Sequence, residues 1–258
     1  MKKRLLSLLL CLLISLSACT AAPQPPSETT SVPTQTQPTE TTLPPETTLP
    51  PHTALYDPSI SQADVIRYFS EVCLDAEYSS GPGDTSLIQK WDTAMVYYIY
   101  GETTPEDIAV LDKLCQWLNG VEGFPGIWRT EDPAAANVRI YFCPQAQIPE
   151  YLGENYYGVD GGVTYWYEDN RMYEATVCYS TDTDQTLRNS VILEEIYNML
   201  GPAQDTQLRP DSIIYSGFSQ PQWLTPTDEL ILRLLYHPDM QPGMDHQAAT
   251  AVIEKLYN

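Results

Sequence analysis

Apolar side chains recur every three or four positions in five segments of the chain, and this period predicts helices. Two of these segments open with Thr-Pro-x-Asp, at 104–107 and 225–228, which is a capping box with proline at the first helical position. Asp184 or Thr186 is expected to cap the helix that ends before Gly201. The predicted helices cover residues 59–78, 105–118, 186–200, 226–236 and 245–257.

Four other segments alternate apolar and polar residues, which is typical of half-buried strands. The last two are expected to pair across the turn at 168–170. Strands stand ahead of the main block of helices, so the order of elements favours the α+β class. The predicted strands cover residues 91–100, 138–142, 163–167 and 173–179.

Residues 20–55 show no such pattern and contain eleven Thr and nine Pro. Within them the segment Glu-Thr-Thr-Leu-Pro-Pro occurs twice in succession, at 40–45 and 46–51. This composition cannot bury a core and favours extended, polyproline-like conformations. We therefore expect a disordered tether at 19–55, followed by one domain at 56–258.

The chain begins with three basic residues and a 14-residue apolar run, Leu5–Ala18, that is too short to span a bilayer. This arrangement indicates a signal peptide at residues 1–18. The run ends in Leu-Ser-Ala-Cys, which resembles the bacterial lipoprotein signal and implies cleavage before Cys19 and lipidation of its thiol. We expect an extracytoplasmic protein anchored to the cell membrane through Cys19. An ordinary signal peptide cut near Ala18, or an uncleaved anchor, is the alternative.

The balance of charge restricts the partners. The chain has 258 residues and a formal net charge of −21. It lacks the clustered basic face that nucleic-acid binding requires, and it carries no polybasic helix for a membrane surface. A domain of this length buries enough surface for a core of its own, and we expect a monomer.

Four cysteines lie in the predicted domain, none of them in a Cys-x-x-Cys pair that would indicate a zinc site. Cys73 and Cys115 fall on apolar helix faces, so we expect them to be small buried side chains. Cys143 and Cys178 both end predicted strands. They either meet in a disulfide or stay buried thiols, and the sequence leaves both alternatives open.

The most informative segment is the predicted helix through Glu194, Glu195 and Asn198. Residues 194 and 198 are about one turn apart and share a helical face. Zinc proteases with the pattern His-Glu-x-x-His-x-x-Gly-x-x-His place two metal ligands at this spacing and a general-base glutamate between them. Aligned on the pattern, Glu195 takes the position of the general base and Gly201 that of the glycine. Glu194, Asn198 and Gln204 replace the three histidines.

Further short motifs accompany this helix. They are Glu-Glu-x-x-Asn-x-Leu-Gly at 194–201, Pro-Asp-Ser-Ile at 210–213, Leu-Leu-Tyr-x-Pro at 234–238 and Pro-Gly-Met at 242–244. With them, residues 56–258 resemble the bacterial family catalogued as domain of unknown function 2927, whose members look like degenerate zincins of the metzincin type. The resemblance implies an α+β, zincin-like fold with a mixed sheet, a central helix at about 186–200 and C-terminal helices. It implies no activity, because none is established for the family.

The residues at the motif positions do not favour zinc, which prefers His and Cys ligands. Glu194, Asn198, Gln204 and Asp205 form the candidate binding set, and their oxygen atoms would suit Ca²⁺ or Mg²⁺ better. We expect no cofactor, with calcium or magnesium as the alternative at these residues. The simplest interpretation places Glu194 and Glu195 on the solvent side of a mostly buried helix.

Three functions follow from these observations. The first is a non-catalytic lipoprotein that binds a peptide or another cell-envelope component, with the strand at 138–142 as the sheet edge that takes an extended peptide. The second is a metal-dependent hydrolase that uses Glu195 as its base. The third is an aromatic module at 151–173, in which Trp166 stacks on envelope glycans.

Overall fold

The computed structural model describes residues 55–74, 87–217 and 219–257. All of these residues belong to one compact unit. The predicted signal peptide and the lipidation site Cys19 lie outside the described residues, as does the predicted tether up to residue 54, so these remain predictions. Within the described ranges, no helix is long and apolar enough to cross a membrane.

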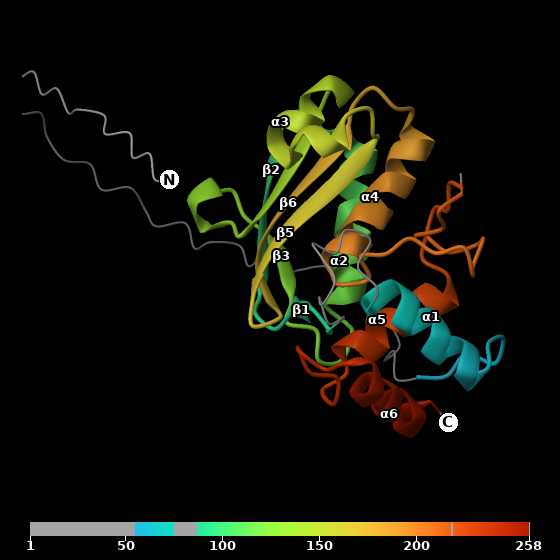
Figure 1. The fold of residues 1–258 in the computed structure, drawn as a ribbon. Helices are drawn as coiled ribbons and strands as arrows, with labels where there is room; N and C mark the ends of the chain where they lie inside the picture. The colour runs from blue at the N-terminus through green and yellow to red at the C-terminus, as the bar shows by residue number, and fades with distance from the viewer. Residues whose placement is uncertain (1–54, 75–86, 218, 258) are drawn as a thin grey trace, which may run out of the picture. The chain divides into compact units, whose positions relative to one another are not determined.

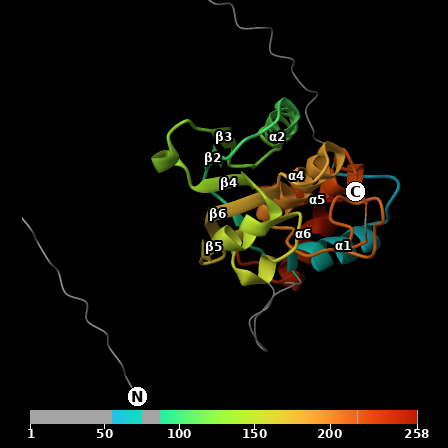
Figure 2. The ribbon, with the colours of Figure 1, turned by 90° about the horizontal axis from the view of Figure 1, so that it is seen from above.

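In these described ranges, six strands form one mixed sheet (Figures 1 and 2). Strands β3, β2, β4 and β6 lie side by side and run parallel, and β5 runs antiparallel to β6 beyond it. The short β1 pairs with the first residues of β6. The strands are β1 (Lys90–Trp91), β2 (Met95–Tyr100), β3 (Ile127–Arg129), β4 (Val138–Cys143), β5 (Gly161–Glu168) and β6 (Arg171–Ser180).

Helices α2 (Pro105–Leu118) and α4 (Gln185–Met199) cover one face of the sheet, as Figure 2 shows. Apolar residues of β4 and β6 that point to this face join the two helices in the main core. On the other face the short helix α3 (Ile148–Leu152) closes a small second core with Cys143 and Cys178.

Helices α1 (Gln62–Leu74), α5 (Pro226–Tyr236) and α6 (His246–Leu256) gather at the end of the domain away from α3 (Figure 1). Two side chains of β1 tie helices to the sheet, Lys90 to the end of α5 and the loop that follows it, and Trp91 to the end of α4. Lys90 Nζ donates to the backbone carbonyls of Leu235, at 2.8 Å, and Met240. Trp91 Nε1 donates to the carbonyl of Met199 at 2.9 Å.

This arrangement confirms the predicted α+β class, with its mixed sheet, its central helix after the last strand and its C-terminal helices, and it is consistent with a zincin-like fold. Both predicted capping boxes are also confirmed. The hydroxyls of Thr104 and Thr225 each accept the backbone N–H of the aspartate three residues on, at 3.1 Å. Those aspartates, Asp107 and Asp228, accept the backbone N–H of the threonines in return, at 2.8 and 2.9 Å.

The hairpin of β5 and β6 is confirmed with a tight turn. Asp169 and Asn170 have φ of 49° and 61°, a left-handed conformation that these two residue types tolerate and that two-residue hairpin turns favour. The turn also holds β1, because the N–H of Lys90 donates to the carbonyl of Asn170 at 3.3 Å.

The position of one strand was predicted wrongly. Residues 138–142 were expected at an edge, but β4 lies between β2 and β6, and the edge strands include β3 and β5. Alternation shows only that one face of a strand is more buried than the other, not where the strand lies in the sheet. The three-residue β3 is too short to show alternation, and the predicted strand 91–100 is interrupted between β1 and β2.

Candidate functional site

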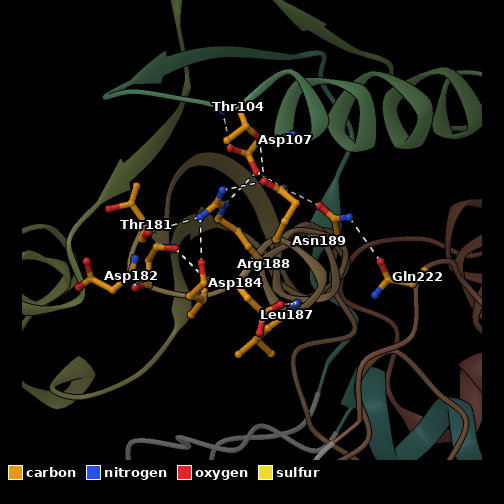
Figure 3. A network of polar contacts seen from close by, with 12 residues as sticks. Thr104, Asp107, Thr181, Asp182, Asp184, Leu187, Arg188, Asn189 and Gln222 are labelled. Carbon is orange, nitrogen blue, oxygen red and sulfur yellow. Dashed lines mark hydrogen bonds and ion pairs between the residues drawn. The ribbon is translucent and has the colours of Figure 1, made fainter.

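The helix that carries the motif, α4, is held at its start by a buried polar network (Figure 3). Asp184, the first of the two predicted caps, accepts the N–H of Leu187 at 3.0 Å. One turn further on, Arg188 Nε donates to Asp107 Oδ1 at 2.9 Å, and these two side chains are only 8% and 1% exposed. Gln185 Nε2 donates to the same oxygen at 2.7 Å.

Asp107 therefore joins the start of α2 to the start of α4. Burial by itself would raise the pKa of this carboxyl, but hydrogen bonds from Arg188, from the backbone of Thr104 and from Gln185 outweigh burial and hold the pKa below its usual range. The carboxylate is thus charged and matched by a guanidinium. The network fixes the position of α4 and so of its motif residues. Its polar groups hydrogen-bond to one another, so its role is structural.

Glu195, the predicted general base, lies against the edge strand β5. Its residue is 9% exposed. A Cβ at Gly161 would stand 3.2 Å from Glu195 Cγ and 2.3 Å from Val191 Cγ1, so this glycine lets β5 pass close to α4. Burial is the main reason why the pKa of the Cys178 thiol is raised, and the nearby charge of Glu195 adds to it. Glu195 is therefore packed between helix and sheet, which corrects the expectation that it lies on the solvent side.

Glu194 and Asn198 share a face of α4, as the spacing predicts, and Asp205 from the following loop acts on Glu194. Burial, with repulsion from Asp205 added to it, raises the pKa of Glu194 to about 7. Asn198 Oδ1 is buried and has no hydrogen-bond partner among the residues that the structure describes. Near neutral pH this face of α4 thus presents a partly protonated carboxyl group and an unused acceptor.

Gln204 is hydrogen-bonded both within its own loop and to helix α1. Its Nε2 donates to the carbonyl of Asp205 at 3.3 Å, and its backbone N–H donates to the carbonyl of Val72 at 3.4 Å. The predicted set of four binding residues therefore divides into the Glu194 face and a residue that supports the loop.

The Pro-Asp-Ser-Ile motif has a structural role. Ser212 Oγ donates to Asp228 Oδ1 at 2.7 Å, and the N–H of Ile213 donates to Asp228 Oδ2 at 3.2 Å. Tyr68 Oη and Thr225 Oγ1 also donate to this carboxylate, at 3.3 and 2.8 Å. The loop is thereby fixed to the cap of α5. The sequence identified both motifs but not their contact, because nothing in their spacing indicates it.

Trp166 does not join the α4 face. Successive residues of a strand point to opposite faces, and Gly161 of β5 packs against α4. Gly162 lies on the α3 side, where a Cβ would stand 2.6 Å from the ring of Tyr156 and 2.8 Å from Leu152. Trp166 shares the parity of Gly162 and is 41% exposed. The candidate residues thus form two sites on opposite faces of the sheet.

The side chains around α4 do not fit zinc. Within the described ranges, no group of three or more His, Cys, Asp and Glu is placed to hold a metal ion. His237 ends α5, where its Nδ1 accepts the N–H of Asp239 at 3.1 Å. Glu194, Asp205 and Asn198 offer oxygen atoms only, so no catalytic step through zinc follows from this set.

Comparisons with known proteins place the chain in a family. The family described as Protein of unknown function (DUF2927) matches residues 62–255. Two solved structures of myroilysin are similar at 14% sequence identity and a TM-score of 0.37. The matches cover 58% and 69% of this chain and 96% of each myroilysin chain. No curated protein matches the chain.

Proposed function

The chain belongs to this family of proteins of unknown function, and on that premise we propose that it is a binding domain, anchored outside the cytoplasm through Cys19, that holds an extended peptide without cutting it. The observation that carries the proposal is the edge strand β5. It has eight residues, it contains neither Pro nor Lys, and no other strand of the described part of the chain pairs with its outer side. An edge of this kind can accept an extended peptide as an added strand.

The hydrogen bonds of the hairpin define which backbone groups of β5 face outward. The N–H of Ser180 donates to the carbonyl of Asp160 at 2.8 Å, so residues 160, 162 and 164 direct their backbone groups toward β6. Gly161, Val163 and Tyr165 then direct theirs away from it. Tyr156 supports this assignment, since its hydroxyl donates to the carbonyl of Val163 at 2.7 Å.

Peptide binding would require one existing hydrogen bond at the outer side of β5 to be replaced. The Tyr156 hydroxyl occupies one outward acceptor of β5, and an incoming strand would replace it with a backbone N–H. The bulge between Trp166 and Tyr167 twists the strand and sets the limit of the segment that can pair. The proposed peptide site is therefore 161–165, next to Glu195 and the motif face of α4.

Binding without cleavage is supported by the side chains beside this edge. Glu195 is buried against Gly161, and the residues at the histidine positions supply no imidazole. A hydrolase would need a polarising group and an activated water at this point. The donor set of α4 gives no zinc site that could provide them.

The test is selection of binders from a random dodecapeptide phage library on the full chain. Val163→Pro removes one outward N–H without loss of a bond to β6, and proline is tolerated at such an edge position. Val163→Ala is the matched control, because it shortens the same side chain but keeps the N–H. We expect selected peptides to bind the wild type and the alanine variant, and to bind the proline variant at least tenfold more weakly.

Glu195→Gln separates binding from hydrolysis. The proposal expects unchanged affinity for the selected peptides and intact peptides in mass spectrometry of both proteins. Cleavage by the wild type that stops in the glutamine variant would establish a hydrolase instead. Equal binding by the alanine and proline variants, with thermal unfolding unchanged, would remove β5 as the site.

A further inference from the structure

The face of the sheet opposite α2 and α4 carries aromatic side chains from several elements. Strand register places these residues on one face, because paired residues of neighbouring strands point the same way. Tyr98 and Tyr100 of β2 pair with Arg139 and Tyr141 of β4. The same rows continue to Thr176 and Cys178 of β6 and to Thr164 and Gly162 of β5. Trp166 lies opposite Glu174 on this face, and Trp128 of β3 lies opposite Val96.

In the described part of the chain, helix α3 covers one end of this face and leaves the rest open. Helix α3 packs over Cys143 and Cys178, and its Tyr151 stacks on Tyr141 with ring centroids 4.0 Å apart. Trp128, Trp166 and Tyr151 remain 52%, 41% and 39% exposed. Single exposed aromatic residues are ordinary, but a group on one flat face indicates an interaction surface.

The tyrosines hold one another in place. Tyr141 stacks on Tyr100 at a centroid distance of 4.6 Å and an angle of 10°, and Tyr100 meets Tyr98 edge-on at 4.7 Å. A row of rings in mutual contact has little side-chain freedom left to lose on binding. Because the rings cover one another's faces, the row offers its edges and hydroxyl groups, while the two tryptophans offer apolar ring surface.

The charges placed on this face cancel. Arg139 and Glu174 form an ion pair, and the hydrogen bond to Glu174 is the main reason that the pKa of Arg139 is raised. The chain as a whole has a formal charge of −21, which opposes the approach of a polyanion. A partner suited to this face is therefore uncharged, with many hydroxyl groups and apolar C–H surfaces.

We propose that the face formed by Trp128, Tyr98, Tyr100, Tyr141 and Trp166, together with the Arg139–Glu174 pair, binds an uncharged polysaccharide. Pyranose C–H faces pack on the tryptophans, and sugar hydroxyls exchange hydrogen bonds with the tyrosines, with Thr164 and with the ion pair. The row from Tyr98 to Thr164 crosses four strands, roughly 14 Å at about 4.8 Å per strand spacing, which accommodates a short run of sugars. The proposal does not rest on peptide binding at β5, because the tryptophans and tyrosines that carry it lie outside residues 161–165, and only Thr164 belongs to both sites.

The test is depletion of the full chain, in mild detergent, by insoluble chitin, cellulose and β-1,3-glucan. Carboxymethyl-cellulose serves as the anionic contrast. We expect retention by at least one neutral polymer that persists in 0.5 M NaCl, because screening weakens only charge-driven binding. The double variant Trp128→Ala/Trp166→Ala should reduce retention at least tenfold.

Tyr56→Ala is the matched control. This aromatic residue is 52% exposed, and it lies before α1, outside the sheet, where its ring contacts Tyr257. It should leave retention unchanged. If the double variant fails to fold, Tyr98→Phe/Tyr100→Phe/Tyr141→Phe removes only hydroxyl groups and should reduce retention at least threefold. No retention on any neutral polymer, retention only by the anionic one, or retention that these variants leave intact would overturn the proposal.

Discussion

Glu194 is a carboxyl group that the fold keeps protonated well above the usual pH. In the unfolded chain its pKa is 4.5, and burial together with Asp205 raises it to about 7 in the folded protein. Between these values the folded state holds a proton that the unfolded state has lost. The free energy of unfolding therefore falls as the pH rises from 4.5 to 7, and Glu194 contributes no further slope above that range.

Glu194→Gln should remove this slope. The amide resembles the protonated carboxyl, so the variant is expected to match the wild type near pH 4 and to be more stable at pH 8 by about 1–3 kcal/mol. Urea unfolding between pH 4 and pH 8.5 measures the difference. Glu254→Gln, at an exposed position of α6, is the control and should leave the slope as it is. Parallel curves for the two variants would contradict the assignment.

At the scale of elements, α2 and α4 are joined through one ion pair. Asp107→Asn leaves Arg188 buried and unmatched, so we expect a loss of about 3–5 kcal/mol in the free energy of unfolding. Asp92→Asn is the comparison. It breaks the ion pair between Asp92 and Arg171, whose side chains are 37% and 51% exposed, respectively. That change should cost less than about 1 kcal/mol. Similar losses for both variants, measured by urea unfolding, would exclude the buried pair as the main tie.

Cys143 of β4 and Cys178 of β6 lie on neighbouring strands, which raises the question of a disulfide between them. Cys178 pairs with Tyr141 and Cys143 with Ser180, so the two cysteines are two residues out of register. Their side chains nevertheless meet in the small core under α3, where the two thiols are joined by a hydrogen bond and not by a disulfide. All four cysteines of the domain are buried thiols. Titration of residues 56–258 in denaturant without reductant should detect four free thiols. Detection of two would show that one disulfide forms.

Elements that depend on contacts between residues close in sequence could be predicted, and those that depend on contacts between distant segments could not. The caps Thr104 and Thr225 fix helix starts through contacts three residues away, so the sequence contains the whole signal. The order of strands does not lie in any local pattern, and β4 was misplaced for that reason. The sequence indicates only part of the aromatic face. The local pattern singles out Trp166, whereas Tyr98 and Tyr141 come to lie on the same face through strand register, which joins β2 to β4 about 40 residues further on.

At the scale of the whole molecule, the membrane anchor is the prediction with the clearest sequence signal. Cells fed an alkyne analogue of palmitate should label the wild-type chain, and Cys19→Ala should abolish the label because the thiol is its attachment point. Cys11→Ala is the matched control, since it alters a cysteine inside the predicted signal peptide and should leave labelling unchanged. Label that persists without Cys19 would show that the anchor lies elsewhere.

Asp107 and Asp228 each close a helix cap and bind a distant segment with the same carboxylate. Asp107 reaches Arg188, and Asp228 reaches Ser212 and Ile213. The first turns of α2 and α5 are thus completed only when the rest of the chain is in place. Helix ends usually fray, but these two should exchange their amide hydrogens as slowly as the core, in the global unfolding event. Local and long-range order in this domain are therefore expected to form together, in one cooperative step.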